Sequence, residues 1–326
     1  MSTQRLPVGV IGVGALGRHH ARHLAGASQA RLVGVHDTDP SRGREVAHQC
    51  GARFYDDVDA LLRDAEAVTI AVPTSAHAEV GLRALARGRA VLMEKPLAAS
   101  LEDADALVDE AARRQVPLAV GHVERFNRAV RAALPFLGDP RYLESDRLAP
   151  FQPRGTDVAV VLDLMIHDLD LILHLTGGMA PVDVRANGIA VLSPHLDMAN
   201  ARVEFATGAV ANVTASRVAR ERIRRLRIFQ PDGYLSLDLA EGTGEFMRLR
   251  DGWREAGGLR LEEIVERVAL EAPDADALGL ELESFVRAAR GDTESVVTGA
   301  EGRAALALAL AVTDAVQHTP VPGHRR

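Results

Sequence analysis

VGVIGVGALG, residues 8–17, is the stretch that decides the fold. The run up to Val13 is apolar, which is typical of a buried β-strand. Gly12, Gly14 and Gly17 follow in GxGxxG spacing, so the strand turns directly into a helix. The first glycine permits the tight turn, the second lets a pyrophosphate approach the backbone, and the third lets the helix pack on the sheet. Because a helix N-terminus also attracts phosphate, this stretch predicts a dinucleotide site.

Asp37 gives the glycine loop its context. It ends the next β-rich run, ARLVGVHD, about twenty residues after Gly17, where an acidic side chain accepts ribose hydroxyls. An acid at this point disfavours a 2′-phosphate, so we expect NAD as the cofactor and NADP less. Arg42 lies close by in the sequence and leaves NADP open. A glycine turn with an unrelated aspartate is the remaining interpretation.

Short β-rich runs and helical runs alternate through the first part of the chain. This alternation predicts a doubly wound α/β domain with a parallel sheet. The expected strands are 8–13, 30–37, 67–73, 90–96 and 117–122. Two of the helices between them carry clear start signals. Asp39 with Pro40 begins a helix that Gly51 ends, and Ser100 caps another over 100–115.

After about residue 140 the pattern changes to β-rich arms joined by turns. Runs 182–192, 201–218 and 226–239 predict antiparallel hairpins, the last around a Pro-Asp-Gly turn. Two helical runs close the chain. We therefore expect a Rossmann domain over 1–122 and a C-terminal α/β domain with an open, mostly antiparallel sheet over 123–326.

Composition excludes several classes of protein. The 326 residues carry a formal net charge of −7, which argues against binding nucleic acid through its phosphates. Cys50 is the only cysteine, so no internal disulfide can form, and no apolar run is long enough to span a bilayer. We expect a cytoplasmic protein that takes neither nucleic acid nor membrane as a partner.

Five motifs occur in the order and spacing of a known family. They are GVIGVGALGRHHA, AVPTSAHAE, EKPL, GHVERFN and DLMIHDLDL. With them the chain resembles the glucose-fructose oxidoreductase, inositol dehydrogenase and MocA family of sugar dehydrogenases over essentially its whole length. The resemblance implies NAD-dependent oxidation of a CH–OH group and an open C-terminal sheet that mediates a homodimer or homotetramer.

The resemblance also implies roles for individual residues. Lys95 matches the family's catalytic lysine, and Asp163 and His167 match its Asp-x-x-x-His pair. The cofactor contacts expected here are Gly12, Gly14, Ala15, Leu16, Gly17, Asp37, Pro73, Thr74, His77, Glu94 and Lys95. The sequence departs from the family at Thr74 and Ser75, where an asparagine often stands.

The segment VLDLMIHDLDLILHL carries five titratable side chains in an otherwise apolar helix. At about 100° per residue, four of them fall within a stripe about 60° wide: Asp163, His167, Asp170 and His174. Asp168 lies outside it. Such a stripe is better explained as one wall of a cavity than as a narrow exposed edge, because buried charges are costly without partners. A zinc site is a remote alternative, and we expect no metal.

A hydride-transfer mechanism follows from these assignments. We expect Asp163 to fix the imidazole tautomer of His167 by a hydrogen bond one helical turn away. His167 then accepts the hydroxyl proton as the hydride leaves for the nicotinamide. Lys95 stabilises the negative charge that develops on the same oxygen. Asp170 and His174 are expected to have structural roles.

Motifs such as GHVERFN and LRIFQPDGYLSLD resemble the branch of the family that includes UDP-N-acetylglucosamine 3-dehydrogenases. The expected reaction is oxidation of the 3-hydroxyl of UDP-N-acetylglucosamine, towards a diamino sugar of lipid A. Arginines would suit its two phosphates. The expected substrate residues are His122, Glu124, Arg125, Arg154, Asp163 and His167. A dehydrogenase of a free polyol such as inositol and a non-catalytic NAD sensor are the alternatives.

The basic run RERIRRLRIF, residues 220–229, is assigned no ligand. On a strand, Arg225 and Arg227 share one face, and Leu226 and Ile228 share the other. Such an arginine face most often contacts solvent or another subunit.

Overall fold

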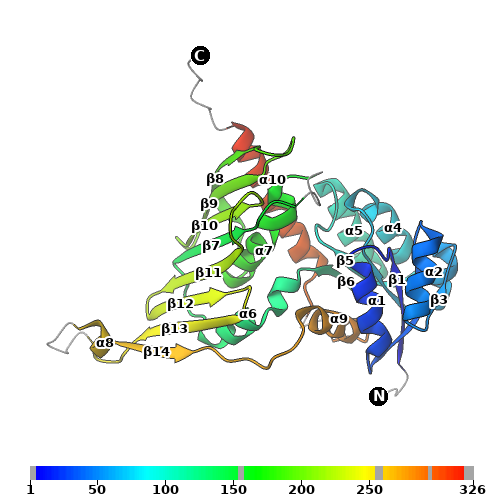
Figure 1. Ribbon diagram of the computed structural model, residues 1–326, viewed down its shortest axis with the longest axis horizontal. Coiled ribbons are helices and arrows are strands. Elements are labelled where there is room, and N and C mark those ends of the chain that lie inside the picture. The colour runs from blue at the N-terminus through cyan, green and yellow to red at the C-terminus, as the bar shows by residue number, and fades with distance from the viewer. Residues whose placement is uncertain (1–4, 153–157, 254–259, 293–295, 319–326) are drawn as a thin grey trace, which may run out of the picture. The chain divides into compact units, whose positions relative to one another are not determined.

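The chain forms two compact units in the computed structural model, which describes residues 5–152, 158–253, 260–292 and 296–318. The first unit comprises the residues up to Val123 together with 275–306. The second comprises 124–274 and the residues from Ala307 onward. Each unit has its own sheet (Figure 1).

The first unit is built on a six-stranded parallel sheet with strand order β3-β2-β1-β4-β5-β6. Its strands are β1 (Leu6–Ile11), β2 (Ala30–His36), β3 (Arg53–Phe54), β4 (Ala67–Ile70), β5 (Ala90–Glu94) and β6 (Leu118–Gly121). Its helices are α1 (Gly17–Gly26), α2 (Pro40–Gln49), α3 (Val58–Asp64), the short 3-10 helix η1 (Thr74–Ala76), α4 (His77–Leu85), α5 (Leu101–Arg114) and α9 (Ala277–Ala288). The predicted doubly wound domain is confirmed, and the short β3 is an addition to the expected strands.

Helices pack against both faces of this sheet. On one face, Val10 of β1 joins a buried cluster with Leu24 of α1 and Phe285 of α9. The neighbouring Gly9 faces the other way, where an added side chain would lie 2.9 Å from Leu61 of α3. The alternation along β1 therefore separates two apolar layers that different helices supply.

The start signals in the sequence act as expected. The Asp39 carboxylate caps α2, which begins at Pro40, and Gly51 follows with a φ of +61°. Ser100 caps α5 by accepting the N–H of Asp103 at 3.1 Å. Both caps satisfy N–H groups that a helix start leaves open, so local chemistry sets where these helices begin.

The chain returns to the first unit near its end, which corrects the expected division into 1–122 and 123–326. Residues 275–306 belong to the first unit. Leu282 and Phe285 of α9 are buried in the same cluster as Leu24 of α1. An amphipathic helix needs a surface to cover its apolar face, but its sequence does not say which unit supplies that surface.

The second unit is built on an eight-stranded sheet with strand order β14-β13-β12-β11-β7-β10-β9-β8. Its strands are β7 (Tyr142–Leu148), β8 (Pro181–Ile189), β9 (Met198–Phe205), β10 (Val210–Ser216), β11 (Ile223–Gln230), β12 (Gly233–Asp238), β13 (Thr243–Leu249) and β14 (Val265–Ala269). The helical segments of this part of the chain are η2 (Val123–Phe126), α6 (Arg128–Ala133), η3 (Leu134–Phe136), the π-helical turn η4 (Val161–Met165), α7 (Ile166–Leu175), α8 (Leu261–Ile264) and α10 (Gly299–His318), which begins in the first unit. β7 and β10 pair in parallel and the other neighbours pair antiparallel, so the predicted mostly antiparallel sheet is confirmed.

β7 lies inside this sheet, although its sequence did not suggest a strand. Leu143, Ser145 and Arg147 are buried on the face that α7 covers, while Tyr142 and Glu144 alternate with them on the other face. Two of the three inward residues are polar, so the usual alternation of apolar and polar residues is hidden. The predicted Pro-Asp-Gly hairpin, in contrast, joins β11 to β12 as expected.

Candidate functional site

The glycine loop connects β1 to α1 as predicted. Gly12 has a φ of +81°, and a side chain there would lie 2.7 Å from the Ala71 carbonyl oxygen. At Gly17 a side chain would lie 1.8 Å from the Gly12 carbonyl oxygen. At Gly14 it would meet nothing within 4 Å. The first and third glycines are therefore required by the backbone, and the second borders open space of the kind a pyrophosphate needs.

Asp37 is buried just after β2 and is engaged by three groups. It accepts the N–H of Val13 and that of Asp39, each at 2.8 Å. Arg42 donates to both carboxylate oxygens, at 3.1 and 2.7 Å. Burial alone would raise the pKa of Asp37, but these hydrogen bonds outweigh it and hold the pKa below its ordinary value. An ionised carboxylate suits the ribose contact, which stays a prediction, and Arg42 keeps NADP as the less favoured alternative.

Four other expected cofactor residues lie on accessible loops. Ala15 and Leu16 are exposed before the start of α1. Pro73 is exposed and Thr74 is half-buried at the start of η1. These loops follow β1 and β4, the neighbouring strands between which the sheet order reverses. Open α/β sheets bind ligands at this point, and the contacts of these four residues stay predictions.

His77 lies beneath these loops. Its ring is buried, with Nδ1 2.9 Å from the Pro96 carbonyl oxygen and Nε2 3.1 Å from that of Val72. Burial lowers the pKa of His77, and the backbone carbonyls oppose this only in part. The expected cofactor contact is therefore corrected: both ring nitrogens face the backbone, and His77 links the loop after β4 to the loop after β5.

Glu94, the last residue of β5, also faces inward. Its Oε1 lies 3.0 Å from Nε2 of His20 on α1, and its Oε2 accepts the N–H of Lys95 at 3.2 Å. Burial would raise the pKa of Glu94, but His20 and Lys95 hold it below its ordinary value. Glu94 thus links α1 to the backbone of Lys95, and its cofactor contact stays a prediction. Sequence reasoning missed His20, because one histidine in a helical run has no distinguishing pattern.

Lys95 follows at the carboxyl end of β5, and its peptide bond to Pro96 is cis. It is the only lysine in a chain with 38 lysines and arginines together. An ammonium is a compact charge whose pKa burial shifts readily, whereas a guanidinium is planar and stays charged. A single lysine at this sheet edge supports the catalytic role that the family resemblance implies.

The segment that carries Asp163 and His167 is not one regular α-helix. Asp163 lies in the π-helical turn η4, and His167 lies in the first turn of α7. A π turn spans more residues than an α turn, so the spacing assumed for a single stripe does not hold there. The expected single stripe is therefore wrong. Asp163 lies in the π turn, and His167, Asp170 and His174 lie in the regular helix α7. Asp163 and His167 are both half-buried. A π turn at this place favours a functional role, because π turns are frequent at functional sites. The Asp163–His167 hydrogen bond stays a prediction.

Asp168 of α7 belongs to a buried ionic cluster between this helix and the sheet of the second unit. Arg147 of β7 donates to Asp168 at 2.6 and 3.1 Å and to Glu124 at 2.8 Å. Ser145 donates to Asp168 at 2.9 Å. Burial alone would lower the pKa of Arg147, but the two carboxylates outweigh it and raise the pKa. Glu124 thus forms a buried ion pair with Arg147, and its substrate contact stays a prediction.

Arg125 pairs with the next acid of α7. Its guanidinium donates to both oxygens of Asp170, at 2.8 and 2.6 Å, and its Nη1 lies 3.2 Å from Nδ1 of His174. This bidentate pair occupies the Nε and Nη2 donors of Arg125, and its phosphate contact stays a prediction. The structural roles expected for Asp170 and His174 agree with it. We call the two ion pairs Arg147–Asp168 and Arg125–Asp170 the helix brace.

Two more substrate candidates complete the set. His122 is buried just after β6, and Arg154 lies outside the described residues. The residues that sequence reasoning missed in this unit are Ser145 and Arg147, because β7 was not recognised as a strand. A signal does exist in YLESDRL, where every second residue from Leu143 points inward. Polar residues at such positions indicate buried partners on a neighbouring helix.

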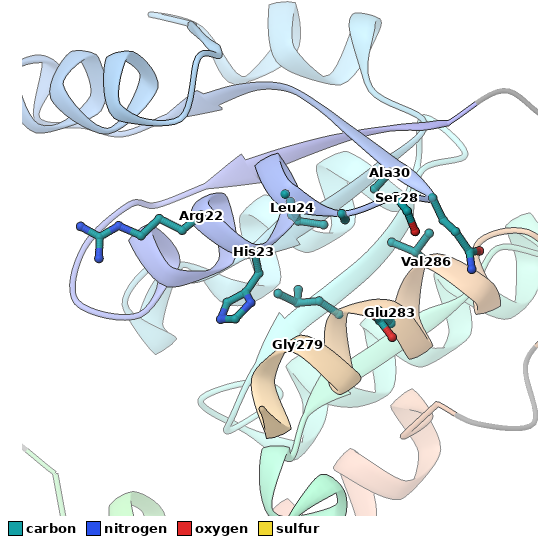
Figure 2. Close-up of a pocket in the computed structure, with 12 residues that line it drawn as sticks. Arg22, His23, Leu24, Ser28, Ala30, Gly279, Glu283 and Val286 are labelled. Carbon is teal, nitrogen blue, oxygen red and sulfur yellow. The ribbon is translucent and has the colours of Figure 1, made fainter. Parts of the chain in front are cut away.

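A cavity of about 420 Å³ lies between α1 and α9 in the first unit (Figure 2). Arg22 and His23 line it from the end of α1, and Gly279 and Glu283 line it from α9. Because α1 runs from the glycine loop towards the start of β2, this cavity lies at the opposite edge of the sheet from the loop. It is therefore separate from the predicted cofactor site.

Two kinds of feature are absent from the residues that the structure describes. In that part of the chain, no group of three or more histidine, cysteine or acidic residues could hold a metal ion. Nor does it contain a helix long and apolar enough to cross a membrane.

Gly14→Val tests the open space beside the glycine loop. A Cβ at this position meets no protein atom within 4 Å, so the melting temperature is expected to stay unchanged. The valine would occupy the space that the pyrophosphate needs, and we expect NAD affinity to fall at least about ten-fold through lost hydrogen bonds to charged phosphate. Calorimetric titration with NADH measures the affinity.

Gly26→Val is the matched control, because Gly26 ends the same helix and also has nothing within 4 Å. Its NADH affinity should equal that of the wild type. Gly17→Ala should instead lower the melting temperature, since its side chain overlaps the Gly12 carbonyl. Wild-type affinity in Gly14→Val would show that the cofactor does not approach this loop.

Asp170→Asn tests the helix brace. Arg125 is 8% exposed and Asp170 is 1% exposed, so the change removes the carboxylate charge that faces a buried guanidinium. We expect the free energy of unfolding to fall by about 3–5 kcal/mol. Urea titration followed by circular dichroism measures the change. Asp183→Asn removes the acid of the exposed pair with Arg185, 2.9 Å apart, and should cost less than about 1 kcal/mol. Equal losses in the two variants would contradict the brace.

Comparisons with known proteins agree with this geometry. Residues 6–122 match the oxidoreductase family with an NAD-binding Rossmann fold, and residues 129–236 match the GFO/IDH/MocA C-terminal domain. A UDP-N-acetylglucosamine 3-dehydrogenase from Acidithiobacillus ferrooxidans is 44% identical over 95% of this chain and 96% of that protein. A myo-inositol 2-dehydrogenase from Thermotoga maritima is 26% identical, again over 95% of this chain and 96% of that protein.

Solved structures give the same result. The structure of a UDP-N-acetylglucosamine 3-dehydrogenase from Acidithiobacillus ferrooxidans has a TM-score of 0.88 and is 43% identical. The match covers 96% of this chain and 98% of that one. Sequence and fold thus agree over both units, and the chain belongs to the GFO/IDH/MocA family of oxidoreductases, with an NAD-binding Rossmann domain.

Proposed function

We propose that this chain oxidises the 3-hydroxyl of UDP-N-acetylglucosamine to a ketone with NAD, on the way to a diamino sugar of lipid A. The observation that carries the proposal is the 44% identity to a UDP-N-acetylglucosamine 3-dehydrogenase, which extends over 95% of the chain and so includes both units. Identity to a myo-inositol 2-dehydrogenase is lower, at 26%. A dehydrogenase of a free polyol is therefore the second candidate.

The first unit offers residues that fit NAD. Open space at Gly14 admits the pyrophosphate, the start of α1 presents N–H groups to it, and ionised Asp37 accepts the ribose hydroxyls. Pro73 and Thr74 line the accessible loop after β4. NAD, when bound, supplies the hydride acceptor.

The chain's own residues handle the proton and the charge on the substrate. His167 takes the hydroxyl proton, and Asp163 holds its imidazole in the required tautomer. Lys95 donates a hydrogen bond to the same oxygen, whose negative charge grows as the proton leaves. A non-catalytic NAD sensor would need none of these three residues, so their joint presence favours an enzyme. The homodimer or homotetramer and the cytoplasmic location stay predictions.

The purified protein is expected to reduce NAD in the presence of UDP-N-acetylglucosamine, which the absorbance of NADH measures. Other UDP-sugars, inositols and free hexoses form the comparison set, and NADP replaces NAD in a parallel series. Turnover with inositol and none with any UDP-sugar would replace the proposed substrate and leave the family unchanged. A chelator should leave the rate unaffected, because no step uses a metal.

Lys95→Ala is expected to bind NADH like the wild type and to lose about a hundred- to a thousand-fold in kcat, since one hydrogen-bond donor to the developing oxyanion is gone. Lys95→Arg keeps the charge but replaces a compact ammonium by a planar guanidinium, so we expect it to stay impaired. Calorimetry measures the binding, and initial rates measure kcat. Wild-type turnover in Lys95→Ala would refute the assignment.

A further inference from the structure

Arg224 belongs to the basic run 220–229. It lies on the other face of its strand from Arg225 and Arg227, for which a contact with solvent or another subunit was expected. It lies on β11 in register with Arg147 of β7. Leu226 and Ile228 alternate with it on the same face and are buried. Arg225 and Arg227 lie on the opposite face, as the sequence predicts. Arg224 therefore sits on the side of the sheet that α7 covers.

The two facing arginines differ in how their charges are paired. Arg147 is 4% exposed and contacts Asp168 at 2.6 Å and Glu124 at 2.8 Å. Within the described residues, Arg224 has an ion pair with the same Glu124 oxygen at 3.6 Å, which is beyond hydrogen-bond length. Its side chain is 40% exposed. The Arg224 fork is thus open to solvent beside a carboxylate that Arg147 already uses.

Burial and two neighbouring arginines disfavour the charged form of Arg224. Burial and the charge of Arg147 lower the pKa of Arg224, and Glu124 and Asp168 offset them only in part. Arg222, two residues earlier, adds to the same effect. A half-buried guanidinium with an incomplete set of acceptors is stabilised by any anion that reaches it.

Arg224 lies at the end of the second unit's sheet where the segment that carries Asp163 and His167 begins. Arg217, in the loop before β11, donates to the carbonyls of Val158 and Leu196. Val160, just before η4, donates to Leu196 at 2.8 Å. Asp168, whose charge acts on Arg224, is next to His167 in α7. An anion bound at Arg224 would therefore lie near the catalytic segment of the same unit.

We propose that Arg224 binds the diphosphate of the nucleotide-sugar substrate. This inference rests on the proposed function and names the residue that distinguishes a nucleotide sugar from a neutral polyol. Arg125, which the sequence suggested for this role, has its fork on Asp170, whereas the fork of Arg224 is available. Arginine suits diphosphate because its planar donors meet two phosphate oxygens at once.

The test compares Arg224→Gln with Arg225→Gln, which removes a neighbouring arginine from the opposite face. Arg224→Gln is expected to raise KM for UDP-N-acetylglucosamine about ten- to a hundred-fold through the loss of charge-assisted hydrogen bonds, with little change in kcat or in KM for NAD. Arg224→Lys should fall between, because it keeps the charge and loses the fork. Arg225→Gln should match the wild type. Thermal melts confirm that each variant is folded.

Calorimetric titration with UDP, at saturating NADH, gives a readout independent of turnover. We expect Arg224→Gln to lose the same ten- to hundred-fold in UDP affinity. If the wild type oxidises UDP-N-acetylglucosamine but Arg224→Gln keeps the wild-type UDP affinity and KM, the inference about Arg224 is overturned and the proposed function stands. A wild type that neither oxidises a UDP-sugar nor binds UDP would overturn the proposed function and this inference together.

Discussion

The second unit depends on how one buried guanidinium is paired. Arg147 is almost fully buried, and a charge in that position costs several kcal/mol unless carboxylates balance it. Glu124 comes from the segment just after the first sheet, and Asp168 comes from α7. Because both carboxylates must reach the same side chain, the pairing fixes where α7 lies on the sheet. An apolar replacement could be as stable, so we infer that the ion pairs are retained for the position they specify.

The helix brace explains why α7 and η4 carry so many charged groups. Asp168 and Asp170 face arginines and are buried, so their charges hold the helix in place. Asp163 and His167 are half-buried instead, which leaves them accessible to a substrate. His167 is adjacent to Asp168, and Asp163 lies five residues before Asp168 on the same segment. A change in a brace residue is therefore expected to affect Asp163 and His167, the proposed catalytic pair, through the position of the segment.

The sequence predicts most of the first unit because its signals are local. Glycine spacing and helix caps depend on residues within one or two turns, and the structure agrees with them. It predicts the second unit less well because the decisive contacts are distant. Arg147 and Asp168 are 21 positions apart in the chain, and no sequence pattern indicates that they form a pair. The π turn before α7 and the return of α9 to the first unit likewise depend on packing that no short pattern records. Lys95 was identified in the sequence through the EKPL motif, which is local and follows the end of a strand.

The same carboxylate links the fold to substrate choice. Glu124 has one oxygen within reach of both Arg147 and Arg224, at 2.8 and 3.6 Å. Arg147, which is the more deeply buried, needs it more, because its desolvation cost is larger. Because Glu124 pairs closely with Arg147, it lies farther from Arg224, and the guanidinium of Arg224 stays partly exposed. The interaction that holds α7 therefore also leaves Arg224 without a close carboxylate partner among the described residues, which is the position proposed for the diphosphate.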